Sequence, residues 1–113
     1  MKYIKDLAMA RSVMIKTKPK TYNVGDIIQV DAILEHPMET GLRKDKDGKI
    51  IPAHHIQKVV VEFDGKSVTT MDMTASVSVN PFISFNLKVT KNAQLKIVAT
   101  DNKGEVQEGT KDI

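Results

Sequence analysis

The chain has 113 residues, of which 41% are hydrophobic, and this is enough to build one folded domain with its own core. Cysteine is absent, which excludes disulfides, thiolate metal sites and a cysteine nucleophile within this sequence. The formal charge of +3 is small, and no run of Lys and Arg is interleaved with aromatic residues, so nucleic-acid binding is not expected.

Residues 1–10 are predicted to form an N-terminal arm, and residues 11–113 a single domain. Asp6 interrupts the apolar stretch that a signal peptide would need. No apolar run approaches the ~20 residues of a membrane span, so no membrane partner is expected. Taken alone, these features indicate a cytoplasmic protein.

Alternation of apolar and polar residues predicts about seven short strands. The first begins near Arg11, with Val13 and Ile15 on one face. The next, residues 27–35, is almost continuously apolar, which favours an interior strand. Further strands are predicted at residues 56–63, 66–72, 82–89, 94–100 and 105–113, the last with few apolar residues, as suits a sheet edge.

Turn signals recur about every 8–12 residues between these strands, a pattern typical of an antiparallel β-sandwich of immunoglobulin type. The predicted fold is therefore an all-β, immunoglobulin-like sandwich with one long ordered loop. A barrel of the OB type is the runner-up, although the aromatic residues that stack on single strands in such barrels are scarce here.

The strand predicted at residues 27–35 carries apolar residues on both of its faces. Four of them share the face assigned to the core: Ile28, Val30, Ala32 and Leu34. Ile27 and Ile33 point the other way. Because only one face of each sheet in a two-sheet sandwich can be core, the second face is expected to need a cover.

The longest connection runs from His36 to His55. Pro37 and Pro52 stiffen its ends, and Asp47-Gly48 is a strong tight-turn signal. The loop carries apolar residues that are expected to hold it against the body: Met38, Leu42, Ile50 and Ile51. Its tip is basic, with Arg43, Lys44, Lys46 and Lys49.

Loops of this length are usually functional or disordered, and this one is interpreted as a partner-docking loop. The candidate docking residues are His36, Pro37, Met38, Gly41, Leu42, Arg43, Lys44, Asp45, Lys46, Asp47, Gly48 and Lys49.

Three histidines flank this loop, which raises the hypothesis of a metal site. Adjacent residues of an extended segment point to opposite faces, so His54 and His55 are not expected to share one ion. A structural role is favoured, with a specific hydrogen-bonding role for His36. Asp45 to Gly48 hints at a calcium loop, but Ile56 stands where the twelfth, acidic ligand belongs. No catalytic residue, cofactor or metal ligand is assigned.

Three segments carry a family resemblance. The stretch from His36 to Pro52 closely resembles the signature of the SoxZ family of sulfur-oxidation proteins. Phe63 to Lys66 is similar to that family's hairpin, and Ser78 to Phe85 to its S-x-N-P-aromatic-x-S-F motif. The resemblance covers about Val13 to Gly104. His54 and His55 depart from the basic or polar residues expected after the proline.

The resemblance implies an immunoglobulin-like sandwich that pairs with SoxY, a subunit whose mobile arm carries sulfur intermediates on a cysteine. This chain would then be the non-catalytic half of a heterodimeric carrier in thiosulfate oxidation, docking transiently to the pathway enzymes. Absence of cysteine fits this role, because a second thiol would risk disulfide exchange. The resemblance also implies export to the periplasm together with the partner, which reverses the cytoplasmic expectation.

Two other functions stay open. One is a free-standing binding or adhesion module, because fold does not determine function. The other is a small metalloprotein that uses the histidines.

Overall fold

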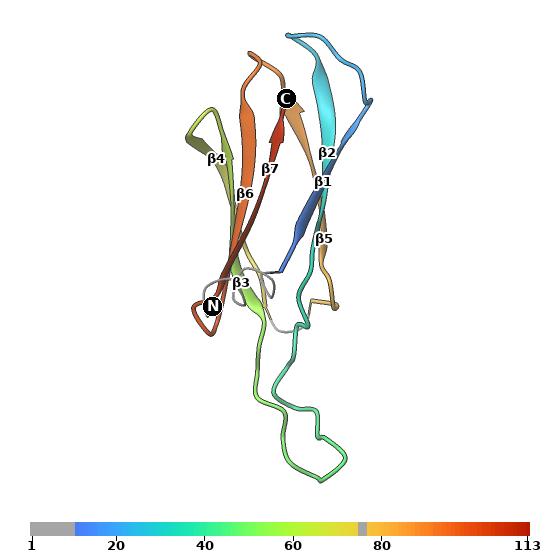
Figure 1. Cartoon of the computed structure of the whole chain (residues 1–113), viewed down its shortest axis with the longest axis vertical. Helices are drawn as coiled ribbons and strands as arrows, with labels where there is room; N and C mark the ends of the chain where they lie inside the picture. Colours follow the sequence, from blue (N-terminus) through green and yellow to red (C-terminus); the bar gives the residue numbers. More distant parts are fainter. Residues whose placement is uncertain (1–10, 75–76) are drawn as a thin grey trace, which may run out of the picture.

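The computed structural model describes residues 11–74 and 77–113. The arm predicted for residues 1–10 lies outside them, so the division into arm and domain stays a prediction. In the described residues, seven strands form two antiparallel sheets that face each other as an all-β sandwich (Figure 1). The seven-strand immunoglobulin-like prediction is confirmed, and two separate sheets replace the single closed barrel of the runner-up.

The smaller sheet has three strands in the order β1-β2-β5. Its strands are β1 (Val13–Lys18), β2 (Ile27–Leu34) and β5 (Phe82–Lys88). The larger sheet has four strands in the order β4-β3-β6-β7. Its strands are β3 (Ile56–Phe63), β4 (Lys66–Asp72), β6 (Gln94–Asp101) and β7 (Val106–Asp112).

The core lies between the sheets and consists mainly of aliphatic side chains. β2 contributes Ile28, Val30, Ala32 and Leu34, which are the residues predicted to face inward. From the other sheet, Val59, Val61, Leu95 and Ile97 are fully buried against them. β2 lies between β1 and β5, as predicted for an interior strand, and β7 is an edge strand, as its composition indicated.

One side of the sandwich is closed where β1 meets β7. A Cβ atom at Gly109 would lie 2.6 Å from the backbone oxygen of Val13, so glycine is what allows the two strands to come this close. Towards the other end of these strands the two edges diverge, and a pocket opens between them.

The long connection between β2 and β3 forms a projecting finger, defined here as residues 37–53 (Figure 1). The radius of gyration of 16.2 Å exceeds the ~13 Å of a compact chain of this length, consistent with such a projection. The prediction that the loop lies against the body is wrong. Leu42 is 85% exposed and Ile50 61% exposed, and of the expected anchors only Met38 is buried.

Backbone pairing explains how the finger is ordered without packing on the body. Its two legs are bridged at Glu39 and His54, and again at Lys44 and Ile50. At the tip, Gly48 takes a φ of 80° in the predicted turn.

Within the described ranges, no helix has the length and hydrophobicity needed to cross a bilayer.

Candidate functional site

The finger is rooted on a buried polar cluster. His36 follows the end of β2 and His54 lies just before β3, so the two histidines mark the base of the two legs. Their rings meet edge to face, with centroids 4.5 Å apart. Asp101, the last residue of β6, lies beneath both rings and is 4% exposed. The cluster therefore ties both sheets together at the root of the finger.

Hydrogen bonds determine the tautomer of His36. The backbone N–H of Met38 donates to Nδ1 over 3.1 Å, so this nitrogen is unprotonated. The neutral ring then carries its proton on Nε2, which donates to Oδ2 of Asp101 over 3.1 Å. His54 places its own Nε2 2.7 Å from the same oxygen and 2.9 Å from Oε1 of Glu105.

Asp101 accepts hydrogen bonds on both of its oxygens. While Oδ2 faces the two histidines, Oδ1 accepts the backbone N–H groups of Lys103 and Glu105, each over 2.9 Å. Glu105 in turn pairs with Arg11, whose Nη1 lies 2.8 Å from Oε1. The chain of contacts therefore reaches from the buried carboxylate to the surface.

The pKa values follow from this geometry. Burial lowers the pKa of His36 more than the hydrogen bond to Asp101 raises it, so the ring stays neutral. Burial would raise the pKa of Asp101, but hydrogen bonds from His36, the Glu105 amide and His54 hold it well below its usual range. A neutral histidine therefore donates to an ionised carboxylate.

His36, His54 and Asp101 are also the type of residues that bind metals, with one ligand atom of each lying within 4.8 Å of the others. The hydrogen bond from Met38 argues against such a site. If Nε2 of His36 bound a metal, the neutral ring would have to carry its proton on Nδ1, and that proton would then face the Met38 N–H. The arrangement fits a hydrogen-bonded cluster better than a metal centre.

The three histidines do not converge. His55 points elsewhere, with its Nδ1 3.3 Å from the backbone oxygen of Ile56, as the alternation of the segment predicted. The specific hydrogen-bonding role expected for His36 is confirmed. Asp101 was not among the predicted residues, because it lies 65 residues from His36 in sequence and no local pattern links the two. The pairing of β3 with β6 brings it to His54, and the packing of the two sheets brings it to His36.

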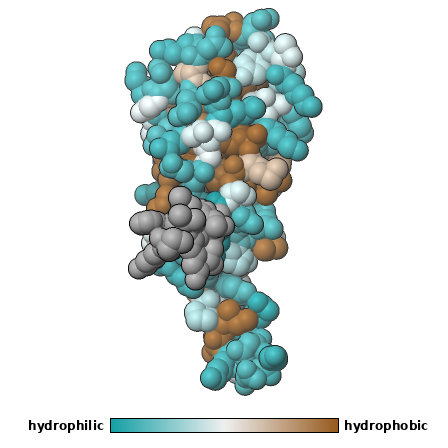
Figure 2. Space-filling view, in the orientation of Figure 1, coloured by the Kyte–Doolittle hydropathy of each residue, from teal (hydrophilic) through white to brown (hydrophobic). Residues whose placement is uncertain are grey.

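The finger presents apolar as well as charged groups. Leu42 and Ile50 form an exposed apolar spot along its length, and Figure 2 shows hydrophobic side chains partway along the finger with hydrophilic ones at its tip. Met38, at the base, has a φ of 50° and is buried, with its sulfur 3.3 Å from the Ile56 amide.

The tip is less basic than its cations suggested. Arg43 is held by Glu39 through two contacts, from Nε to Oε1 at 3.1 Å and from Nη2 to Oε2 at 2.5 Å. Asp45 accepts the amides of Asp47 and Lys49, which shapes the turn. The other three cations of the tip, Lys44, Lys46 and Lys49, take part in no ion pair with the described residues.

A second exposed apolar surface lies on the outer face of the smaller sheet. Met14 pairs in register with Ile33, and Ile33 with Phe82, so the three side chains form a row across all three strands. They are 52%, 41% and 61% exposed, respectively. Ile27, further along the same strand and on the same face, is 67% exposed. We call Met14, Ile27, Ile33 and Phe82 the outer apolar face.

Beside the row lies Asp31, which is largely buried although it belongs to the same outer face. Its carboxylate accepts hydrogen bonds from Gln29 and Ser84, at 2.8 and 2.7 Å, and it pairs with Lys18 at 3.2 Å. These hydrogen bonds, with the cation beside them, lower the pKa of Asp31. The face thus combines an apolar row with a fixed carboxylate whose hydrogen bonds are satisfied.

Comparison with known families gives a match over nearly the whole sequence. The model of the family described as "Sulphur oxidation protein SoxZ" matches residues 15–112. The chain belongs to the SoxZ family. The resemblance seen in the finger, the hairpin and the stretch from Ser78 to Phe85 is thereby confirmed. A comparison with curated protein sequences gave no match.

Several solved structures resemble this SoxZ-family chain in fold. A superoxide reductase (neelaredoxin) from Ignicoccus hospitalis is 19% identical with a TM-score of 0.69, over 96% of this chain and 83% of that one. The sulfur carrier protein SoxY from Chlorobium limicola f thiosulfatophilum is 14% identical with a TM-score of 0.62, over 89% and 72%. At these identities the likeness concerns the fold alone.

Proposed function

We propose that this SoxZ-family chain is the non-catalytic subunit of a heterodimeric sulfur carrier, pairing with a SoxY-type subunit that bears the reactive cysteine. The observation that carries the proposal is the outer apolar face, considered together with family membership. An apolar row across a whole sheet is costly to leave in water and marks a surface that a partner covers.

The outer face of the β1-β2-β5 sheet is the proposed dimer surface. Met14, Ile33 and Phe82 would form its apolar centre, and Asp31 with Lys18 a polar neighbour that aligns the partner. An obligate interface of this kind buries more than about 2,000 Å² in total. Such burial would cover most of a three-stranded sheet.

The finger is the proposed docking element for the enzymes that act on the carrier. It is held rigidly at its root by the buried cluster and projects clear of the sandwich (Figure 1). Leu42 and Ile50 offer apolar contact, while Lys44, Lys46 and Lys49 supply a positive field that steers anionic partners. The guanidinium group of Arg43 is already paired with Glu39, so it is not free to bind a sulfonate or carboxylate of a partner.

Catalysis is assigned to the partners. The buried histidines and Asp101 satisfy one another and the backbone, and cysteine is absent from the sequence.

We also propose that the chain works in the periplasm, exported together with its partner, as the resemblance implies. Fractionation of cells that express both subunits tests this location, and a purely cytoplasmic chain would contradict it.

Sedimentation velocity tests the heterodimer. Mixed at micromolar concentration with the SoxY-type subunit, this chain should sediment as a one-to-one complex. Ile33→Glu places a charge in the middle of the apolar row and should raise Kd about 30-fold or more, the factor that ~2 kcal/mol represents. Val68→Glu, on the 50%-exposed Val68 of the other sheet, is the matched control and should leave Kd unchanged. Failure of the wild-type chain to associate would refute the proposal.

A further inference from the structure

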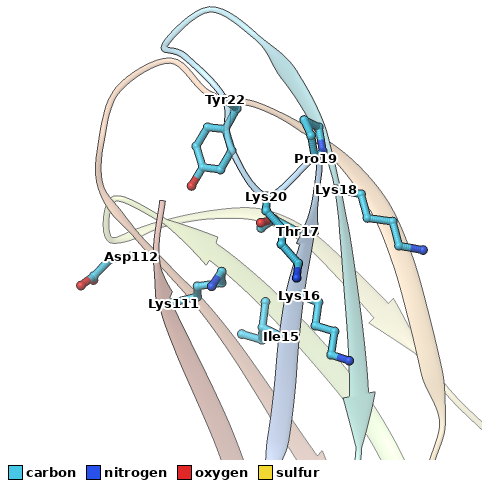
Figure 3. Close-up of a pocket in the computed structure, with 9 residues that line it drawn as sticks. All are labelled: Ile15, Lys16, Thr17, Lys18, Pro19, Lys20, Tyr22, Lys111 and Asp112. Atoms are coloured by element: carbon cyan, nitrogen blue, oxygen red, sulfur yellow. The ribbon is translucent and has the colours of Figure 1, made fainter.

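The gap between β1 and β7 opens into a pocket of about 670 Å³, within the usual range for small-ligand sites (Figure 3). It lies apart from the finger, and it adjoins the outer face of the smaller sheet only through Lys16 and Lys18. Lysines line it from two separate edges of the sandwich. Lys16, Lys18 and Lys20 come from β1 and the turn after it, and Lys111 comes from β7.

Lys111 is unusual because it lies on the inner face of its sheet. It pairs in register with Leu95, which is completely buried, and cross-strand partners point to the same face. Thr17 on β1 likewise pairs with the buried Val30 and faces inward. Lys111 thus directs its side chain towards the space between the sheets.

That cation has no counter-charge in the described part of the chain. Lys111 and Lys20 take part in no ion pair there, whereas Lys18 is held by Asp31. Asp112 also lines the pocket, but Figure 3 shows its carboxylate pointing away, while Lys20, Lys111 and the Tyr22 hydroxyl border the gap. An ammonium group that borders a pocket without an ion-pair partner can pair with an anion that enters the pocket.

We propose that this pocket binds a small oxyanion group, a sulfate or sulfonate, between Lys20 and Lys111. The two ammonium groups supply positive charge from the two sides of the pocket. The Tyr22 hydroxyl can donate a hydrogen bond to the anion. Two sources offer this chemistry: a free sulfur oxyanion, or a sulfonate carried on the partner's cysteine. The second source rests on the proposed carrier function.

The competing explanation is protection of an edge. Inward-pointing charges on edge strands prevent unwanted strand pairing, and β7 is such an edge. In that case Lys111 would keep the chain monomeric and bind nothing. The two explanations differ in what an anion does to the isolated chain.

An NMR titration of the isolated, 15N-labelled chain separates them. Sodium sulfate and sodium thiosulfate are added in parallel against sodium chloride of equal ionic strength. The proposal predicts saturable shifts of the Thr17, Lys20, Tyr22 and Lys111 amides with the two sulfur oxyanions and not with chloride. Shifts that never saturate, or that chloride reproduces, would overturn it.

Variants locate the site. Lys20→Gln combined with Lys111→Gln should weaken binding at least tenfold. Lys58→Gln combined with Lys66→Gln removes the same charge from exposed positions on β3 and β4 and should leave affinity within twofold. If the first variant self-associates while its anion affinity is unchanged, the lysines protect the edge and the proposal is wrong.

A second experiment identifies the source of the anion. In the heterodimer, an S-sulfonate on the partner's cysteine should produce the same amide shifts without added anion if the carried group docks here. Shifts with free anion alone would assign the pocket to the free oxyanion. Failure of the carrier function would instead appear as absence of the heterodimer in sedimentation, with the free-anion titration of the isolated chain unaffected.

Discussion

His36 illustrates how a single residue makes the finger root sensitive to pH. Its ring is neutral, buried, and placed between the Met38 amide and Asp101, with His54 beside it and Arg11 nearby. A proton added to this ring would lie on Nδ1, facing the Met38 N–H. Protonation is therefore resisted in the folded state and free in the unfolded one.

Acidification is expected to destabilise the folded chain through His36. The pKa of His36 in the folded chain lies below its ordinary value of 6.5, so between these two values the unfolded state binds more protons. The stabilisation is complete above about pH 6.5 and is lost as pH falls towards the folded pKa. Urea unfolding from pH 7.5 to 5 should show the free energy of unfolding decreasing over this window.

Replacing His36 tests the assignment. His36→Gln keeps a donor for Asp101 and cannot titrate, so the variant should be less stable at pH 7.5 but lose less stability on acidification. His55→Gln, at the histidine that lies outside the cluster, is the matched control variant. An unchanged slope in His36→Gln would show that the pH response comes from other groups.

At the scale of elements, Gly109 controls how β7 approaches β1. The 2.6 Å between its hypothetical Cβ and the Val13 oxygen is too short for any real contact, and the obstacle is backbone. Gly109→Ala should cost roughly 1–3 kcal/mol of unfolding free energy, as overpacking usually does. Thr110→Ala, at the exposed neighbouring position, is the control. Equal stability of the two variants in urea would contradict the close approach.

The finger is proposed to be needed for function but not for the stability of the fold. Leu42→Ser with Ile50→Ser should change the free energy of unfolding by no more than about 0.5 kcal/mol, because both side chains are exposed. The same variant should slow thiosulfate oxidation by the reconstituted pathway, and Val24→Ser, also exposed, should not. A large loss of stability would show instead that the finger is a structural cover.

Across the whole molecule, the sequence was informative wherever local pattern determines structure. Alternation identified most of the strands and the inward face of β2, because one face of each strand must be buried. The scarcity of apolar residues identified β7 as an edge strand. The turn at Asp47-Gly48 was predicted because few residues adopt its positive φ. Apolar residues on both faces of β2 also predicted the exposed Ile27 and Ile33 of the outer apolar face.

Long-range geometry was not predictable in the same way. Leu42 and Ile50 were expected to pack on the body, yet the finger is ordered by its own backbone bridges. Nothing local links Asp101 to His54, which meets it through the pairing of β3 with β6, or to His36, which meets it through the packing of the two sheets. The inward position of Lys111 likewise depends on its register against Leu95.

The central claim is that a SoxY-type subunit covers the outer apolar face of the β1-β2-β5 sheet. Methyl cross-saturation NMR on the assembled heterodimer, with this chain deuterated except at its methyl groups and the partner fully protonated, tests it most directly. The account predicts strong attenuation of the methyl signals of Met14, Ile27 and Ile33, and none at Val68 on β4. Attenuation at Val68 with Met14 and Ile33 unaffected would contradict it.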